Sequence, residues 1–281
     1  QYAPAMRFLL SIALAALAVA AAIGSGATAM LSRNVLDVNG FTAVLVGTAQ
    51  SPAGQQLVRT TVANTLVDRA AAGGYDGLAI RAAAGVAGDW AAMAVRKPGA
   101  TRVLASTAVG LQQGILTGTQ SGVVEFDVRA FASALEPPPV VATALAAIPG
   151  PLLVQVPWVE ISPGAQTILQ ELDRHRWLPA GLALLAVMLA LLALMVARRR
   201  GFTLVVMGLL LAVAAWFLRP VATGTASSMV AGRSADVTTG PLADEFIQRI
   251  FTGWSAVSGA LIAIGIALVV VGVVFGVRRR S

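Results

Sequence analysis

Four long apolar segments, none of which contains a charged side chain, constrain the fold of this chain more than any other feature. They cover residues 8–30, 177–197, 201–218 and 254–277. A helix needs about 20 apolar residues to cross the hydrocarbon core of a bilayer, and it satisfies its backbone hydrogen bonds internally. The sequence therefore predicts a multi-pass protein of the plasma membrane with four transmembrane helices.

The charge distribution fits a membrane protein and argues against a nucleic-acid partner. Only 12% of the 281 residues are charged, whereas soluble domains carry about 25%. The formal net charge of +7 arises in three short segments beside the apolar runs, at Arg7, Arg198, Arg199, Arg200, Arg278, Arg279 and Arg280. Elsewhere the basic and acidic residues balance, so we expect no nucleic-acid-binding surface.

These arginines also predict the orientation in the membrane. Short loops that flank transmembrane helices retain their basic residues on the cytoplasmic side. The loop at 198–200 is so short that the helices before and after it form a hairpin, and placing it in the cytoplasm places both termini there too. Trp177, Trp216 and Trp254 then lie at the outer ends of their helices, where indole rings favour the membrane interface.

The predicted fold class is mainly α: a four-helix transmembrane protein with a mostly helical extracytoplasmic domain that contains a minor short β element. The chain then has five parts: residues 1–30, the N-terminal cytoplasmic end and first transmembrane helix; 31–176, the extracytoplasmic domain; 177–218, the hairpin of the second and third helices; 219–253, an extracytoplasmic loop with an amphipathic segment; and 254–281, the fourth helix and the Arg-rich cytoplasmic C-terminus.

The first apolar segment has an alternative interpretation as a cleavable signal peptide. Arg7 would supply a minimal basic region, and Ala27-Thr28-Ala29 has the small residues that a signal peptidase prefers. The apolar run is longer than the usual 7–15 residues of such a peptide. We therefore expect the segment to stay in the mature protein as an anchor.

Local patterns in residues 31–176 predict mostly helices. Ser51-Pro52 is a typical helix start, a capping hydroxyl followed by proline. A helix from 78 to about 95 is expected after the turn at 72–77, and 97–99 interrupts it. Alternating apolar residues predict a strand at 123–128, and a second candidate strand covers 152–156.

The sequence also predicts how the two extracytoplasmic regions connect to the transmembrane helices. Residues 166–173 are expected to run directly into the second transmembrane helix. The loop after Arg219 opens with Gly, Ser, Thr and Ala and is expected to be irregular. Its end, 242–251, is amphipathic and either lies on the outer membrane surface, docks on the outer domain, or extends the fourth helix.

Short motifs resemble those of a group of uncharacterised actinobacterial membrane proteins with four spans. The motifs comprise Asn34-Val35-Leu36-Asp37 with Phe41 shortly after; the short strand at 123–128 before a helix at 130–135; and Ala165-Gln166, Leu172-Asp173 and Trp177-Leu178-Pro179 at the junction with the second span. The resemblance covers nearly the full length. It implies this architecture and an extracytoplasmic helical domain, and it implies no activity.

Residue types that carry catalysis or bind cofactors are sparse. The chain has no cysteine, and His175 is its only histidine, whereas haem and catalytic zinc sites usually take two or more such ligands. Glu125 and Asp127 share one face of a predicted strand, where two solvated acids are the simpler interpretation. The apolar segments contain no ionisable group for a proton or ion path. We expect no metal, no cofactor and no enzymatic activity.

Small residues recur at helical spacing in the first and fourth apolar segments. These positions are Ala16, Ala20 and Gly24 in the first segment, and Gly259, Ala263, Ala267, Gly272 and Gly276 in the fourth. Such stripes let helices approach closely in lipid, although a composition rich in small residues gives the same pattern. The serines and threonines of the apolar segments are expected to bond to the preceding helical turn.

These observations favour a non-catalytic accessory or scaffold subunit of a larger membrane complex, whose partners are membrane lipids and other integral membrane subunits. The alternative is a lipid-binding or envelope-precursor-binding protein with an apolar groove in its extracytoplasmic domain. An enzyme built on scattered carboxylates is the third hypothesis.

Overall fold

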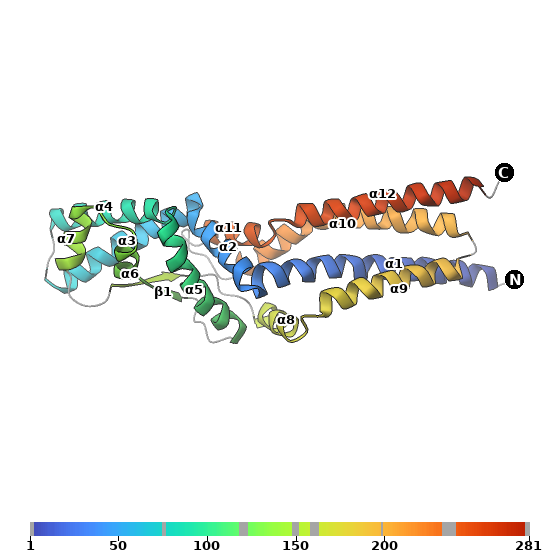
Figure 1. Ribbon diagram of the computed structural model, residues 1–281, viewed down its shortest axis with the longest axis horizontal. Coiled ribbons are helices and arrows are strands. Elements are labelled where there is room, and N and C mark those ends of the chain that lie inside the picture. Colours follow the sequence, from blue (N-terminus) through green and yellow to red (C-terminus); the bar gives the residue numbers. More distant parts are fainter. Residues whose placement is uncertain are drawn as a thin grey trace. The chain divides into compact units, whose positions relative to one another are not determined.

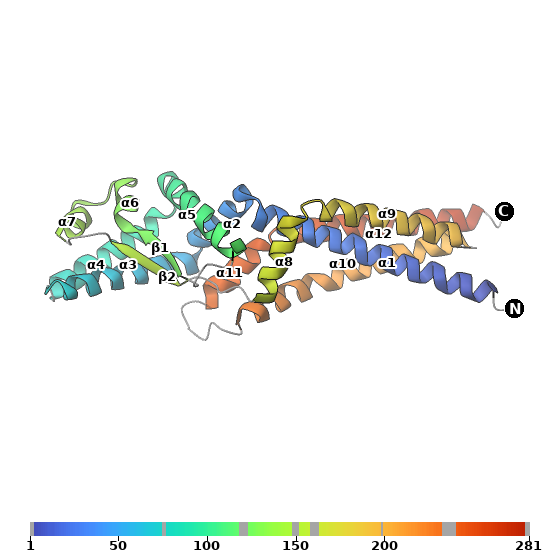
Figure 2. The ribbon, with the colours of Figure 1, turned by 90° about the horizontal axis from the view of Figure 1, so that it is seen from below.

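A computed structural model describes residues 3–74, 77–117, 123–147, 152–157, 163–197, 199–231 and 240–278. The elements, shown in Figures 1 and 2, are α1 Ala3–Leu31, the π-helix η1 Ser32–Leu36, α2 Val38–Gln50, α3 Pro52–Ala72, α4 Leu78–Ala94, α5 Pro98–Thr117, β1 Val123–Asp127, α6 Val128–Ser133, α7 Pro139–Ala147, β2 Leu153–Pro157, α8 Pro163–Arg174, α9 Leu178–Val196, α10 Arg200–Ala231, α11 Gly240–Ile250 and α12 Trp254–Arg278.

The chain forms two compact units, which we describe separately. The bundle unit contains Gln1–Ser32, Glu171–Thr225 and Phe251–Ser281, and the domain unit contains Arg33–Gln170 and Ala226–Ile250. Each unit is therefore built from segments that are far apart in the sequence.

Four helices are long and apolar enough to cross a membrane, as the sequence predicts. These are Met6–Leu36, Leu178–Val196, Arg200–Phe217 and Trp254–Gly276, and they are consistent with a multi-pass membrane protein. The pair α4 and α5 also meets this test of length and composition when taken together, with a bend of 86° between the two helices.

Small side chains form the core of the bundle unit. α1 packs along α9, where Ala15, Ala18 and Ala193 are buried. Leu204 and Met207 of α10 join the same core. Because lipid tails are as apolar as leucine, close van der Waals packing and interhelical hydrogen bonds hold such helices together.

The domain unit is built on a hairpin of α3 and α4. Ser51 starts α3 as predicted, since its side chain accepts a hydrogen bond from the amide of Gly54 and Pro52 follows it. Trp90 of α4 and Phe131 of α6 meet edge to face in the core, with ring centroids 6.0 Å apart. Their burial joins the hairpin to the later helices of the unit.

Two short strands lie in the domain unit. β1 and β2 pair antiparallel, with Val123 opposite Pro157 and Asp127 opposite Leu153. The first corresponds to the strand expected at 123–128, and the second to the candidate at 152–156. Val128 then donates its amide to the carbonyl of Leu152, which continues the pairing to the start of α6.

Two expectations about the connections are wrong, and one of the alternatives left open for 242–251 is excluded. Helix α10 continues to Ala231, so the loop after Arg219 does not begin irregularly. Ser, Thr and Gly each cost less than or about 1 kcal/mol in a helix, which a helix that is already formed can absorb. Helix α8 ends at Arg174 and does not run into α9, because a turn precedes the first residues of α9. Helix α11 is a separate element that docks in the domain unit, and it does not extend α12.

Candidate functional site

Helices α10 and α12 of the bundle unit approach closely through four glycines. A Cβ atom added to Gly272 would lie 2.6 Å from the carbonyl oxygen of Gly201, and one added to Gly265 would lie 2.6 Å from that of Gly208. Conversely, a Cβ atom added to Gly201 of α10 would lie close to the carbonyl oxygen of Gly272, and one added to Gly208 would lie close to that of Gly265. The four residues therefore form a reciprocal seam that recurs every seven residues.

The small residues predicted on α12 divide between this seam and the outside of the bundle unit. Gly272 lies in the seam. Cβ atoms added to Gly259 and Gly276 would meet no heavy atom within 4 Å among the described residues, and Ala263 and Ala267 are exposed. Helix α12 thus carries one small-residue face packed on α10 and a second, open face.

On α1, the alanines at the contact are neighbours of those predicted. Ala16 and Ala20 are exposed, while Ala15 and Ala18 face the core. A Cβ atom added to Gly24 would lie 3.6 Å from Leu182 of α9, at ordinary van der Waals distance.

One hydroxyl departs from the expected bonding. Ser25 of α1 donates to the carbonyl of Pro179 of α9 over 2.8 Å, between two helices. Ser11, Thr203 and Ser258 each donate to a carbonyl three or four residues earlier, as expected.

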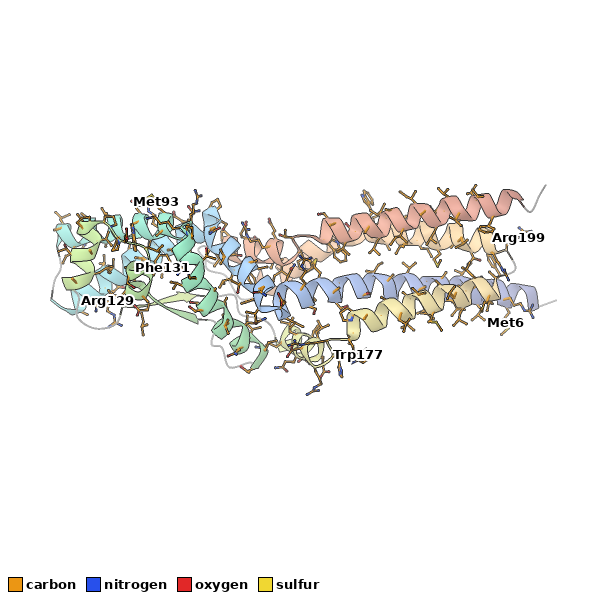
Figure 3. All side chains as sticks on the ribbon, in the orientation of Figure 1. Met6, Met93, Arg129, Phe131, Trp177 and Arg199 are labelled. Atoms are coloured by element: carbon orange, nitrogen blue, oxygen red, sulfur yellow. The ribbon has the colours of Figure 1, made fainter. Side chains whose placement is uncertain are left out.

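The predicted interface and orientation residues differ in burial. Trp177 and Trp216 are 67% and 65% exposed, and Figure 3 shows Trp177 projecting outward. Trp254 is only 5% exposed, so its ring lies inside the protein and does not present itself to a membrane interface. Arg199 and Arg200 are exposed; Arg198, Arg279 and Arg280 lie outside the described residues, and Arg278 is the last residue of α12.

The Asn34–Asp37 motif connects several parts of the domain unit. The side chain of Asn34 donates to the carbonyl of Ile250 at the end of α11 over 2.6 Å. The buried side chain of Gln112, on α5, donates to the carbonyl of Val35 over 2.7 Å. Asp37 caps α2 by accepting from the amide of Gly40. The motif thus holds α2, α5 and α11 around the π-helix.

Helix α11 docks on α2 with its apolar face. Phe246 contacts Phe41 edge to face, with ring centroids 6.3 Å apart. Arg249 forms an ion pair with Glu245 at 2.8 Å and passes over Gly47, where an added Cβ atom would lie 2.5 Å from its Nη1. This docking matches one of the three alternatives for the amphipathic segment.

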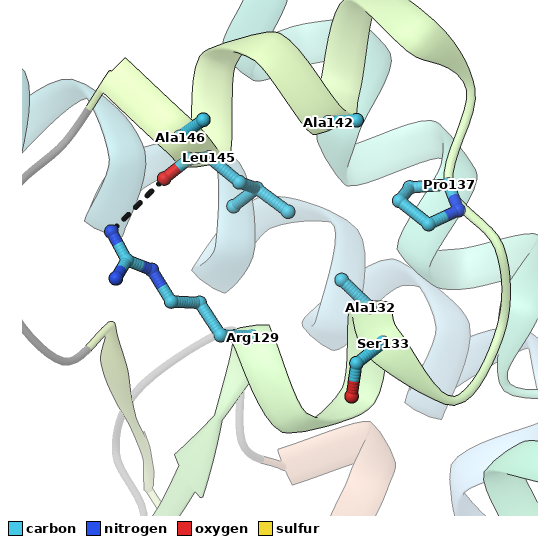
Figure 4. A pocket seen from close by; sticks show the side chains of 7 residues that line it. All are labelled: Arg129, Ala132, Ser133, Pro137, Ala142, Leu145 and Ala146. Atoms are coloured by element: carbon cyan, nitrogen blue, oxygen red, sulfur yellow. Dashed lines mark hydrogen bonds between the residues drawn. The ribbon is translucent and has the colours of Figure 1, made fainter.

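A pocket of about 330 Å³ lies between α6 and α7 in the domain unit. It is lined by Arg129, Ala132, Ser133, Pro137, Ala142, Leu145 and Ala146. Figure 4 shows Arg129 reaching from α6 to the carbonyl of Leu145 on α7, a hydrogen bond of 3.0 Å from Nη2. Sequence patterns gave no indication of this site, since its lining combines three alanines with single arginine, serine, proline and leucine residues.

No family model, curated protein or solved structure matches this chain.

Several titratable residues of the described segments form ion pairs, one of which joins α3 and α4 through Arg59 and Asp89 at 2.7 Å. His175 lies 3.6 Å from Glu171, which also pairs with Arg174 at 3.0 Å. Asp127 accepts from the amide of Arg129 as the cap of α6, which is a structural role; the side chain of Glu125 lies outside the described residues. Within those segments, no three His, Asp or Glu residues gather as metal ligands would.

Proposed function

We propose that this chain is a membrane-anchored accessory or scaffold subunit that binds another integral membrane subunit through the open face of α12. The observation that carries the proposal is the division of small residues on this helix. Gly265 and Gly272 form the seam with α10. Gly259, Ala263 and Ala267 form a second, open face that is also made of small residues.

The physical argument is that small residues allow two helix backbones to approach closely in lipid. The gain then comes from van der Waals contact along the whole crossing. The α10–α12 seam is an internal example of such a contact within this chain. The open face offers a partner helix the same kind of surface.

The same proposal includes the orientation of the chain in the membrane and its resemblance to other four-span proteins. Both termini lie in the cytoplasm and the domain unit lies outside, which the exposed Arg199 and Arg200 and the outward Trp177 and Trp216 support. The resemblance to the four-span actinobacterial group belongs to the same proposal and rests on the sequence motifs alone, among them Asn34 to Asp37.

The test is recovery of partner proteins after mild detergent extraction from native membranes. Ala263→Leu with Ala267→Leu adds volume to the open face without touching the seam. We expect at least a tenfold loss of partner recovery, with unchanged thermal stability of the chain itself.

The matched control adds the same volume on α9, as Ala180→Leu with Ala183→Leu, both exposed positions. We expect this variant to recover partners like the parent protein. Equal recovery for the two variants would show that the open face binds lipid only, and the scaffold proposal would fail.

A second candidate function is binding of a lipid or envelope precursor by the domain unit. The pocket between α6 and α7 favours it, because most of its lining residues are apolar. Its volume of about 330 Å³ lies at the lower end of the range of about 300–1,000 Å³ for ligand pockets.

A further inference from the structure

The outer face of α4 is apolar, whereas a surface helix of a soluble domain normally presents charged and polar side chains there. Leu78, Val86 and Met93 are 87%, 47% and 64% exposed, and Figure 3 shows Met93 on the outside of the domain unit. Together with the exposed Ala82, they recur at intervals of four and seven residues, which places them on one side of the helix. The opposite side of α4 lies in the core of the domain unit, where Ala87 is buried.

The two charged residues of α4 are already engaged within the chain. Asp89 forms an ion pair with Arg59 of α3 at 2.7 Å, so this acid adds no net charge to the outer face. Arg81, the other charged residue of the helix, also interacts within the chain. The outer face of α4 is therefore left to its apolar side chains.

A group of basic residues, which we call the basic corner, follows the C-terminal end of this face. It consists of Arg96, Lys97 and Arg102, which are all exposed. The sequence between Asp89 and Glu125 contains these three basic residues and no acid. None of the three forms an ion pair with a described residue.

The nearest acid from a packed neighbour does not cancel this charge. A Cβ atom added to Gly99 would lie 2.8 Å from the carbonyl oxygen of Ala134, so the end of α6 lies against the basic corner, and Glu136 follows two residues later. Three basic residues and one acid leave a net charge of +2 at this place. The corner therefore favours an anionic partner.

The composition of α4 and α5 identifies a lipid surface as that partner. Taken together, the two helices are as apolar as a membrane span, but they are bent by 86°, and Arg96 and Lys97 would lie at the middle of such a span, where charged groups are costly. An apolar helix face flanked by basic residues is instead typical of a helix in the membrane interface. Its apolar side chains enter the bilayer by about 5–10 Å, and its basic residues are attracted to anionic lipids.

We propose that the outer face of α4 docks on the anionic surface of the bilayer that anchors the chain, with Leu78, Val86 and Met93 in the interface and the basic corner at the lipid phosphates. The tether through the bundle unit makes this contact intramolecular, so that a weak contact suffices. The apolar side chains extend along about 22 Å of helix and are separated by small residues. A protein partner would favour a compact cluster of large side chains.

The test measures the environment of a fluorescent label on the full-length protein in lipid nanodiscs. The chain contains no cysteine, so Ala82→Cys provides one site for an NBD label on the outer face of α4. In nanodiscs with about 30% phosphatidylglycerol, we expect the NBD emission to shift to the blue and to be quenched by doxyl-labelled lipids. In nanodiscs of phosphatidylcholine alone, both effects should be at least twofold smaller. The label control is Thr143→Cys, at an exposed position of α7, which should not respond.

Variants test the apolar face and the basic corner separately. Val86→Glu should lower the ratio of docked to undocked protein at least tenfold, whereas Val140→Glu, the same exchange at an exposed valine of α7, should leave it unchanged. Each basic residue near an anionic surface contributes about a fivefold gain in binding. Arg96→Gln with Lys97→Gln should therefore lower the ratio about 25-fold. All four positions are exposed, so we expect unchanged thermal stability.

Four results would overturn the proposal. A blue shift without quenching by labelled lipid would show that protein covers the face. A response that appears in phosphatidylcholine nanodiscs only after anionic vesicles are added would assign the face to an apposed membrane. Equal responses in the two kinds of nanodisc would exclude a role for anionic lipid. Equal responses of Val86→Glu and Val140→Glu would show that the outer face of α4 does not make the contact.

Discussion

The two glycines of the Gly272–Gly276 motif should respond in opposite ways to the same substitution. An added methyl group at Gly272 would lie 2.6 Å from the carbonyl oxygen of Gly201 and 2.9 Å from Cγ2 of Val205. To reach ordinary contact at about 3.4 Å, α10 and α12 must separate by about 0.8 Å at this point. At Gly276 the methyl group would enter open space among the described residues.

The magnitude follows from the loss of close contact. A gap of 0.5–1 Å forfeits a quarter to a half of the attraction of each atom pair across it, and overpacking of a filled interior costs about 1–3 kcal/mol. We therefore expect Gly272→Ala to destabilise the bundle unit by about 1–3 kcal/mol. Gly276→Ala should change the stability by less than about 0.5 kcal/mol, as surface substitutions do.

The assay is equilibrium unfolding of each full-length variant in mixed micelles with increasing SDS, followed by tryptophan fluorescence. Gly276→Ala is the matched control, since it lies one turn away on the same helix and changes the same atoms. Equal unfolding midpoints for the two variants would refute the seam, because a Cβ atom added to Gly272 would meet α10 whereas one added to Gly276 would meet no described atom within 4 Å.

Three further predictions address other parts of the chain. Gly88→Ala should destabilise the domain unit by about 1–3 kcal/mol, measured by thermal unfolding, because its Cβ atom would lie 2.5 Å from the carbonyl oxygen of Arg59 on α3; an unchanged melting temperature would contradict this. Ser25→Ala should weaken the α1–α9 pair by about 0.6 kcal/mol, the average for a polar contact in a membrane bundle, in the same SDS titration, and a stability equal to the parent would show that its bond adds nothing. A cysteine at Ser106 should react with a membrane-impermeant thiol reagent in intact cells, while one at Ser281 should not; the reverse pattern would overturn the proposed orientation.

The sequence predicts the four membrane helices because their signal is local. Each apolar run contains enough residues to cross the hydrocarbon core, so length and composition suffice. The start of α3 is equally local, since Ser51 and Pro52 act on the adjacent helical turn. Predicting such features does not require knowing which helices pack against each other.

The helix contacts could not be predicted in the same way. A search at every fourth residue identifies Gly272 of the seam together with Gly259 and Ala263 outside it, and it misses Gly265, because the seam has a spacing of seven. Both spacings keep residues on one side of a helix, so the sequence alone does not indicate which side α10 covers. The glycines at 201 and 208 on α10, with the same spacing, are the signal that could have indicated it.

The same limitation explains the burial of Trp254 and the continuation of α10. An indole at the end of an apolar helix favours the membrane interface only if no other part of the protein covers it, and Trp254 is covered. Residues such as Ser and Gly weaken a helix without ending it, so α10 passes the expected boundary. In both cases tertiary context outweighs a local preference.

The polar side chains of the Asn34–Asp37 motif have structural roles in the domain unit. Asn34 binds the last carbonyl of α11, and Asp37 caps α2. Both side chains thereby satisfy backbone groups that helix ends leave without an intrahelical partner. The carbonyl that Asn34 binds lies 216 residues further along the chain, so this role depends on the docking of α11 and no local sequence pattern could have predicted it.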